Sequence, residues 1–233
     1  MLALYELAGA DPSVRFSPHC WKTRFALAHK GLSAERRPWR FTEKAAIAFA
    51  GTDKVPVLVD GDRAVADSWA IAEHLEAAYP ERPSLFGAPD AAAVTRFVNA
   101  WADAVVMPAL SRLIITDVFA AVAPEDRAYF RSSREQRFGM ALERVTADRK
   151  SGLAAFRTLL APLRRILADQ PFVGGGAPRY ADHCAFAPLM WARCVSDLAV
   201  LEPGDVVAGW AERMLEAYDG LARNAPRAGR AAT

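Results

Sequence analysis

The chain has 233 residues, of which 52% are hydrophobic and 24% charged, a balance typical of globular proteins that excludes disorder throughout. The formal net charge is +2, so no strong overall field favours nucleic acid or acidic membranes as partners. We find no apolar run of the ~18 residues that a membrane span needs, and no secretory signal, so no membrane partner is expected.

The first 80 residues predict alternating strands and helices. Strands are predicted at residues 3–7, 34–38, 55–60 and 63–66, and helices at residues 18–30, 42–50 and 68–79. Gly61 and Asp62 form a turn between the last two strands, which predicts a hairpin. The first strand–helix–strand unit implies a parallel crossover.

Residues 79–89, YPERPSLFGAP, hold three prolines and one glycine and predict a linker. Beyond them the strand pattern disappears. Helices are predicted at residues 90–121 with a bend at Pro108, and at residues 124–150, 152–168, 182–196 and 204–224. We therefore expect an α/β domain at residues 1–80, a linker at 81–89, an all-α domain at 90–226 and a flexible tail at 227–233.

The three cysteines are far apart in the sequence: Cys20, Cys184 and Cys194. An odd, widely spaced set argues against a disulfide scaffold and fits a reducing cytoplasm, where we expect the protein. His19 and His183 each stand beside a cysteine, but adjacent residues do not make a four-ligand zinc site, so no metal is expected.

A possible anion site lies between the first predicted strand and helix, in the segment FSPHC (residues 16–20). Ser17 is a good helix N-cap, and Pro18 is favoured at the first helical position. The free N–H groups and partial positive charge of a helix N-terminus also stabilise an anion such as a thiolate. Cys20 is a rival nucleophile, in the second and less reactive position of a C-x-x-C spacing.

Two further segments allow both a structural and a functional interpretation. Pro56 opens a predicted strand and is either an ordinary edge-strand proline or a cis proline that frees the Val55 backbone for an extended peptide ligand. Asp67 and Ser68 begin the next helix and are either caps or the groups that hold an amino-acid head group. The glycines of residues 174–176 lack a following Gly-Lys-Ser/Thr and predict a connector rather than a phosphate loop.

In this order and spacing, Ser17-Pro18, Val55-Pro56 and Asp67-Ser68 resemble the glutathione-binding domain of the cytosolic glutathione transferases. This family has a thioredoxin-like α/β domain followed by an all-α domain, and the resemblance covers nearly the whole chain. SPHCWKTRFALAHKG (17–31) and VPVLVDGDRAVADSWAIAEHLEAAYPERPSLFG (55–87) are most similar to bacterial β-etherases, which cleave β-aryl ethers of lignin-derived aromatics, and to the fungal FuA class. One departure is Arg179, which stands where the family has a capping residue.

The resemblance implies that glutathione is the co-substrate. Ser17 would hydrogen-bond the glutathione sulfur and lower the pKa of the thiol, and the Val55 backbone, beside a cis Pro56, would pair with the cysteinyl part. The thiolate would then attack a hydrophobic, aromatic electrophile, and a β-aryl ether is one example.

The two ends of glutathione would be held by other residues. The resemblance assigns the γ-glutamyl end to Asp67 and Ser68. Lys54 is the first candidate for the glycyl carboxylate, and Arg40 and Lys44 are weaker ones. A homodimer is also expected by resemblance.

The second substrate would bind where the helical domain faces Ser17. Apolar and aromatic side chains are the candidates, although most of those at helical spacing are expected to be core. The candidates are His19, Trp39, Trp101, Val105, Met107, Leu110, Ile114 and Phe119. Two other functions stay open: a non-catalytic binder of glutathione or hydrophobic ligands, and a glutathione-dependent isomerase, which would need a basic clamp for a dicarboxylate.

Overall fold

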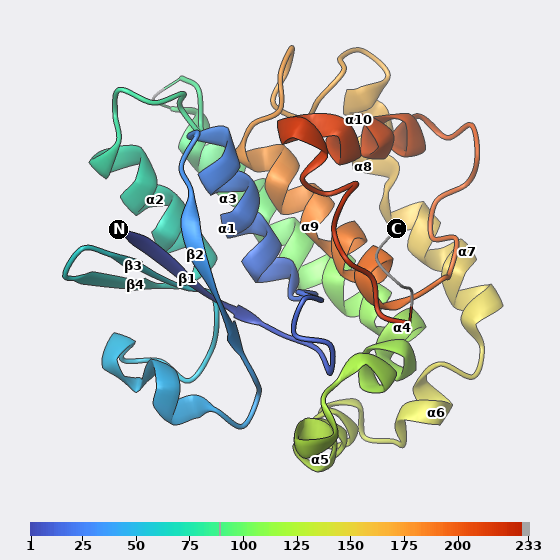
Figure 1. The fold of residues 1–233 in the computed structure, drawn as a ribbon. Coiled ribbons are helices and arrows are strands. Elements are labelled where there is room, and N and C mark those ends of the chain that lie inside the picture. Colours follow the sequence, from blue (N-terminus) through green and yellow to red (C-terminus); the bar gives the residue numbers. More distant parts are fainter. Residues whose placement is uncertain (89, 230–233) are drawn as a thin grey trace.

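The computed structural model describes residues 1–88 and 90–229, and Figure 1 shows an α/β part beside a group of helices. Its sheet has the order β2-β1-β3-β4, from β1 (Leu2–Leu7), β2 (Ala34–Trp39), β3 (Val57–Asp60) and β4 (Arg63–Ala66). β1 runs parallel to β2 and antiparallel to β3, and β4 returns antiparallel to β3. The predicted crossover and hairpin are therefore confirmed.

Three helical segments complete this domain: α1 (Pro18–His29), α2 (Ser68–Ala78) and the 3₁₀ segment η1 (Lys44–Ala50). α1 begins at its Ser-Pro cap and is followed by Gly31 in the left-handed region, φ 64°, which glycine adopts without steric cost. α1 packs against both α2 and α9 (Tyr180–Val195), so the hydrophobic core runs without interruption from the sheet into the helical domain.

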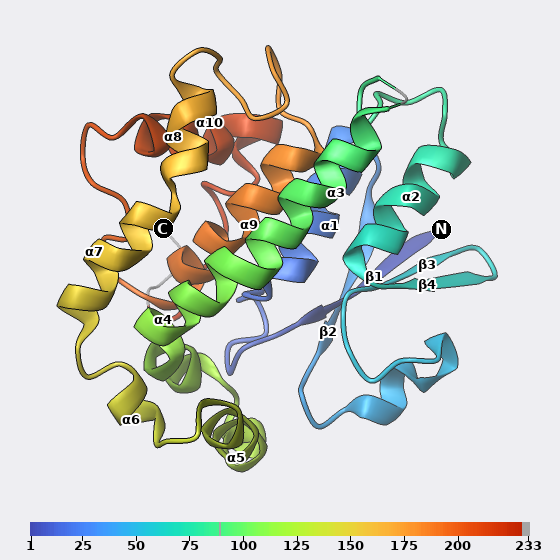
Figure 2. The ribbon, with the colours of Figure 1, turned by 180° about the vertical axis from the view of Figure 1, so that it is seen from behind.

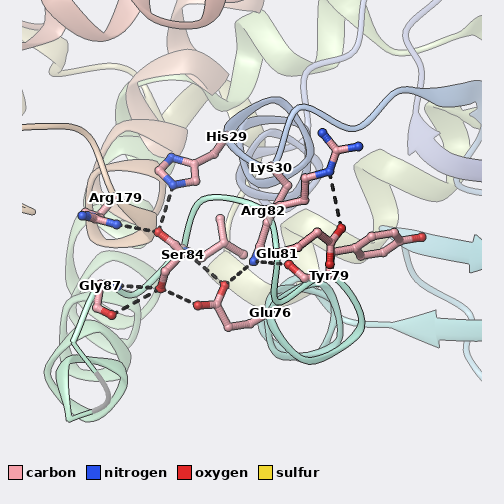
Figure 3. Close-up of polar contacts among 10 residues, drawn as sticks. His29, Lys30, Glu76, Tyr79, Glu81, Arg82, Ser84, Gly87 and Arg179 are labelled. Atoms are coloured by element: carbon pink, nitrogen blue, oxygen red, sulfur yellow. Dashed lines mark hydrogen bonds and ion pairs between the residues drawn. The ribbon is translucent and has the colours of Figure 1, made fainter.

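The linker between the domains is fastened by side chains rather than loose (Figure 3). The carbonyl of Ser84 accepts hydrogen bonds from Arg179 Nη1 at 2.7 Å and from His29 Nε2 at 2.9 Å. The Ser84 hydroxyl donates to Glu76, which also pairs with Lys30 Nζ at 2.7 Å. Groups from α1, α2 and the start of α9 thus fix the path of the chain between the domains.

The helical domain opens with a rod made of α3 (Ala91–Trp101), the π-helical turn η2 (Ala102–Val106) and α4 (Met107–Ala121). Seen from behind, this rod runs alongside α9, which contacts all three of its segments (Figure 2). Pro108 has no N–H to donate back into the preceding turn, which explains the wider π turn just before it. The predicted bend is thus a local widening of an otherwise continuous helix.

The rod also corrects one expectation from the sequence. Residues Ala91–Ala121 form a helix long and apolar enough to cross a membrane, by length and composition only. In this fold, apolar residues of this helix such as Leu110, Leu113 and Ile114 pack in the hydrophobic core. The long apolar helix is therefore explained as a core helix.

The predictions of one continuous helix at 124–150 and another at 152–168 are wrong, although most of both ranges is helical. The chain instead forms the 3₁₀ turn η3 (Pro124–Asp126), α5 (Arg127–Phe138), α6 (Leu142–Val145), α7 (Arg149–Leu159) and α8 (Ala161–Leu167). Gly139, at φ 69°, ends α5, and Pro162 restarts the helix at α8. Mixed charge at helical spacing therefore did not reveal the interruptions at residues 139–141 and 146–148.

The C-terminal part differs from the predicted helix at 204–224 and contacts α9 beyond it. α10 (Val206–Gly220) contains left-handed residues at Tyr218 and Asp219, which interrupt the predicted helix 204–224. Beyond it, Arg227 Nε donates to the Arg193 carbonyl at 2.7 Å, and Ala228 N donates to the carbonyl of Cys194 at 2.8 Å. Arg227 and Ala228, from the expected flexible tail, thus contact the end of α9, and residues 230–233 lie outside the described chain.

Candidate active site

A cleft of about 410 Å³ lies between the two domains. One wall comes from the α/β domain and includes Phe16, Ser17, His19, Trp39, Phe41, Lys54 and Val55. The facing wall comes from α4, α5 and α9 and includes Met107, Ser111, Ile115, Tyr129, Phe130, Arg134, Arg137 and Trp191. Aromatic rings therefore surround a space that the N-terminus of α1 enters.

Ser17 caps α1, as the structural interpretation of the sequence predicted. Its Oγ accepts a hydrogen bond from Cys20 N at 3.4 Å, which is long for an N–H···O bond. A hydroxyl that accepts in this way still has its own proton to donate. The cap and a hydrogen bond from Ser17 to a bound anion are therefore compatible.

Cys20 does not meet the requirements of a nucleophile. Its side chain is completely buried, and this burial, with the nearby Glu6 carboxylate, raises the pKa of the thiol to about 12. Reactive cysteines have a lowered pKa and an accessible sulfur. The geometry therefore favours Ser17 over Cys20 as the group that meets a substrate.

The second segment carries a cis peptide bond between Val55 and Pro56, just before β3. The Pro56 carbonyl accepts from Asp67 N at 3.3 Å, which brings the start of α2 beside this bend. Asp67 has φ 78° and ψ 133°, a conformation that costs a non-glycine residue on the order of 1–3 kcal/mol. Its Oδ1 accepts from Trp69 N and Ala70 N, so Asp67 is a helix cap in a strained backbone.

Ser68 is buried next to this cap. Its carbonyl accepts a 2.6 Å hydrogen bond from the hydroxyl of Tyr180, at the first turn of α9. Neither Asp67 nor Ser68 lines the cleft, whereas Lys54 and Val55 do. The two candidates for the γ-glutamyl end therefore lie beyond the cis proline, outside the aromatic space.

The candidates for the glycyl carboxylate separate clearly. Arg40 pairs with Glu125 at 3.4 Å, and Lys44 pairs with Asp53 at 3.1 Å. Neither Arg40 nor Lys44 lines the cleft, and Lys54 does. Lys54 is thus the member of the three that is placed beside the cleft.

His19 lines the cleft, and its surroundings disfavour the charged form of its ring. Burial, and next the positive charge of Lys22, lower the pKa of His19, against smaller opposite effects of Asp103 and Asp67. Lys22 is itself fully buried, and its Nζ donates to Asn99 Oδ1 at 2.8 Å and to Asp103 Oδ1 at 2.5 Å. This buried bridge from α1 to the rod was missed in the sequence, because its partners are 77 and 81 residues away.

The structure brings some of the predicted substrate residues to the cleft and not others. His19, Trp39 and Met107 line it, whereas Trp101 and Val105 do not. On α4 the lining residues are spaced as Met107, Ser111, Ile115 and Val118, and Val105 lies about 200° around the helix from Met107. Leu110 and Ile114 are core, as expected, and Phe119 contacts the ring of Phe130 but does not itself line the cleft.

The sequence did not predict the contribution of α5. Tyr129, Phe130, Arg134 and Arg137 line the cleft from this helix, and Phe41 packs on Phe130 at a centroid distance of 5.5 Å. The signal was aromatic residues interleaved with arginines on one predicted helix, a pattern equally typical of a solvated face. Within the described residues, no group of three His, Cys, Asp or Glu side chains could hold a metal ion.

The chain thus combines a thioredoxin-like sheet with an all-α domain, and a cleft lies between them at the start of α1. Residues 12–83 match the family model of the glutathione S-transferase N-terminal domain, and residues 93–219 match that of the C-terminal domain. The chain therefore belongs to the glutathione S-transferase family, whose co-substrate is glutathione.

Solved structures agree with this fold. Glutathione transferase GSTFuA3 from Phanerochaete chrysosporium has a TM-score of 0.81 and 24% identity, over 91% of this chain and 95% of that chain. The glutathione S-transferase CsGST63524 of Ceriporiopsis subvermispora, in complex with glutathione, has a TM-score of 0.83 and 23% identity, over 94% and 96%. A glutathione S-transferase from Rhodospirillum rubrum has a TM-score of 0.68 and 24% identity, over 94% and 90%.

Proposed function

We propose that this protein is a glutathione transferase in which Ser17 stabilises the glutathione thiolate for attack on a hydrophobic, aromatic electrophile. The observation that carries the proposal is the position of Ser17. It stands at the N-terminus of the 12-residue helix α1 and faces a wall of aromatic rings across the cleft. A hydroxyl donor and a helix N-terminus in one place favour a bound anion, and the rings favour an aromatic partner.

The chemistry follows from the thiol. A free thiol has a pKa near ~8.5, and each unit by which the site lowers it corresponds to about 1.4 kcal/mol of thiolate stabilisation. The thiolate forms a C–S bond to the electrophilic carbon, and the leaving group departs with its electron pair. For a β-aryl ether the broken bond would be C–O and the leaving group a phenolate, a substrate that the resemblance to β-etherases suggests.

The rest of glutathione would extend along the α/β domain. The Val55 backbone, beside the cis Pro56, would pair with the cysteinyl part, and Asp67 and Ser68 would hold the γ-glutamyl end. Asp67 Oδ1 caps α2, which leaves Oδ2 for the ligand ammonium. Lys54 would neutralise the glycyl carboxylate, because it lies at the cleft while Arg40 and Lys44 are held in ion pairs.

The thiol pKa of bound glutathione tests this role of Ser17. Thiolate absorbance in the ultraviolet, measured against pH, should show a lowered pKa for the wild-type protein. Ser17→Ala should raise that pKa by about 1–2 units, because a hydrogen bond to a charged group contributes roughly 1.5–3 kcal/mol.

Ser111→Ala is the matched control, since it removes a hydroxyl from the facing wall of the same cleft. The thiol pKa should stay lowered in this variant. If glutathione binds to the wild-type protein with an unshifted thiol pKa, the protein is the non-catalytic binder rather than a transferase. If Ser17→Ala and Ser111→Ala change the pKa equally, Ser17 has no special role.

A glutathione-dependent isomerase is a second candidate, favoured by one observation. Such an enzyme needs a basic clamp for a dicarboxylate, and Arg134 and Arg137 are two basic groups in the cleft wall. An isomerase regenerates glutathione in each cycle, whereas a transferase consumes it. Titration of free thiol during turnover therefore separates the two activities.

We also propose that the protein is a cytoplasmic homodimer. Cys20, Cys184 and Cys194 are free and buried, which suits a reducing compartment. On α3, Val94 is 67% exposed and Phe97 is 74% exposed. Two large apolar side chains one turn apart, in a family that commonly dimerises, support a second copy of this chain as their partner.

A further inference from the structure

Helix α5 places two guanidinium groups in the cleft wall. Arg134 and Arg137 are three residues apart and therefore lie on the same face of the helix. The guanidinium carbon of Arg134 lies 4.7 Å from the ring centroid of Phe130 and 5.3 Å from that of Phe41, and both rings line the cleft. Arg134 is thus held against the aromatic surface on which an aromatic substrate would lie.

Arg134 and Arg137 differ from Arg131, on the same helix, in their ion pairs. Arg131, on the same helix, is bound by Glu135 at 2.9 Å and by Glu143 at 2.8 Å. In the described part of the chain, no carboxylate pairs with Arg134 or Arg137, and Arg134 Nη1 donates to the hydroxyl of Ser133. Their charges are therefore left to be neutralised by solvent or by a ligand.

The charges around the cleft favour an anion as that ligand. Lys54 adds a third positive charge on the α/β wall. Asp53 is the acidic side chain at the rim, and it is already paired with Lys44 at 3.1 Å. Burial and the neighbouring charge of Arg137 lower the pKa of Arg134, so a bound anion would relieve a repulsion that exists in the free protein.

We propose that the electrophilic substrate carries a carboxylate, which Arg134 and Arg137 bind while its aromatic ring packs among Phe41, Tyr129 and Phe130. The planar fork of a guanidinium matches a carboxylate in two parallel hydrogen bonds. Lys54, on the opposite wall, is reserved for the glycyl carboxylate of glutathione. The inference rests on the proposed transferase activity and defines the substrate class of that activity.

A pair of aryl chlorides tests the inference: 4-chloro-3,5-dinitrobenzoate and its methyl ester. In both, the glutathione sulfur forms a bond to the ring carbon, the C–Cl bond breaks, and chloride leaves with the electron pair. The quantity to compare is kcat/KM divided by the uncatalysed rate constant with glutathione, because the ester is the more activated ring. We expect this ratio to favour the acid by about tenfold or more, as for other charge-assisted contacts.

Variants identify the groups responsible. The double variant R134M/R137M should bring the acid-to-ester preference down towards one, and R137M alone, at an exposed position, should lower it in part. R63M/R165M removes two exposed charges from β4 and α8, outside the cleft, and should keep the preference. Added salt should reduce the preference of the wild-type protein, because it screens the attraction.

Failure of the inference differs from failure of the proposed function. Equal acceleration of acid and ester, or a preference that survives R134M/R137M, would overturn the carboxylate site while the transferase activity stands. A loss of glutathione binding in R134M/R137M would also overturn it, because the arginines would then hold the glycyl carboxylate. Binding of glutathione with no acceleration of either chloride would refute the transferase itself.

Discussion

Glu6 does not line the cleft, but it is the buried carboxylate that three arginines approach. It is completely buried on β1, and its carboxylate lies 2.7 Å from Arg36 Nε, 3.6 Å from Arg24 Nε and 3.8 Å from Arg15 Nε. Arg24 also lies over the ring of Trp21, about one turn earlier on α1. The negative charge of Glu6 therefore offsets the positive charges of three arginines near α1.

Glu6→Gln should destabilise the protein strongly. Removing one partner of a buried ion pair leaves uncompensated charge and costs about 3–5 kcal/mol, and here three guanidinium groups lose the same partner. The free energy of unfolding in urea measures the loss.

Glu35→Gln is the control for that change, because Glu35 pairs with Arg37 at the surface of the adjacent strand. Exposed pairs contribute about 0–1 kcal/mol, so this variant should unfold almost like the wild-type protein. If the two variants lose similar free energy of unfolding, the burial of Glu6 does not explain the importance of its charge.

At the scale of elements, two histidines join α1, α9 and α10 around one tyrosine. Tyr218 Oη lies 3.0 Å from His29 Nδ1 and 2.7 Å from His183 Nε2. Because His29 Nε2 donates to the Ser84 carbonyl, its Nδ1 accepts from the Tyr218 hydroxyl, and His183 Nε2 donates to that hydroxyl. This assignment leaves His183 Nδ1 buried with no hydrogen-bond partner.

The cluster makes stability depend on pH. Burial lowers the pKa of His29 and lowers that of His183 far below the ordinary 6.5, so both are neutral in the folded protein. The unfolded chain takes up protons as the pH falls below 6.5, and the folded chain does so only at lower pH. The stabilisation is therefore complete above 6.5 and is lost on acidification, by up to about 1.4 kcal/mol per pH unit for each histidine that stays neutral.

His183→Gln should flatten this dependence, because an amide keeps a donor but does not titrate. Urea unfolding of the wild-type protein and the variant between pH 7.5 and 5.5 measures the effect. The variant should lose less stability per pH unit over this range, even if it is less stable at pH 7.5. Parallel curves for the two proteins would show that His183 is not the group that titrates.

For the whole molecule, the exposed face of α3 defines the next prediction. If Val94 and Phe97 meet a second copy of the chain, Phe97→Asp should place a charge in the interface and give a monomer in sedimentation equilibrium. Ile166→Asp, at an exposed apolar residue of α8, should stay dimeric. A wild-type protein that is monomeric at micromolar concentration would refute the dimer directly.

The order of elements was predictable because its signals are local. The Ser17-Pro18 cap and the turn at Gly61 each depend on a few neighbouring residues, and both lie where the sequence placed them. Prediction failed where one residue outweighed a pattern. Gly139 broke a helix that periodic charge suggested, and the left-handed backbone at Tyr218 broke another.

The sequence was enough to predict Ser17 at the start of α1, because a helix cap depends on neighbouring residues. Its resemblance to the glutathione transferases indicated the two-domain family and proposed Val55 and Lys54 for the glutathione site. Only the tertiary structure shows that Arg134 and Arg137 line the cleft, and which residues of α4 line it with them. It also decided that Lys22 is buried against Asp103, 81 residues away. Such contacts depend on how helices pack across the domains. Local sequence patterns do not predict them, because burial and charge pairing act through space between residues that are far apart in the sequence.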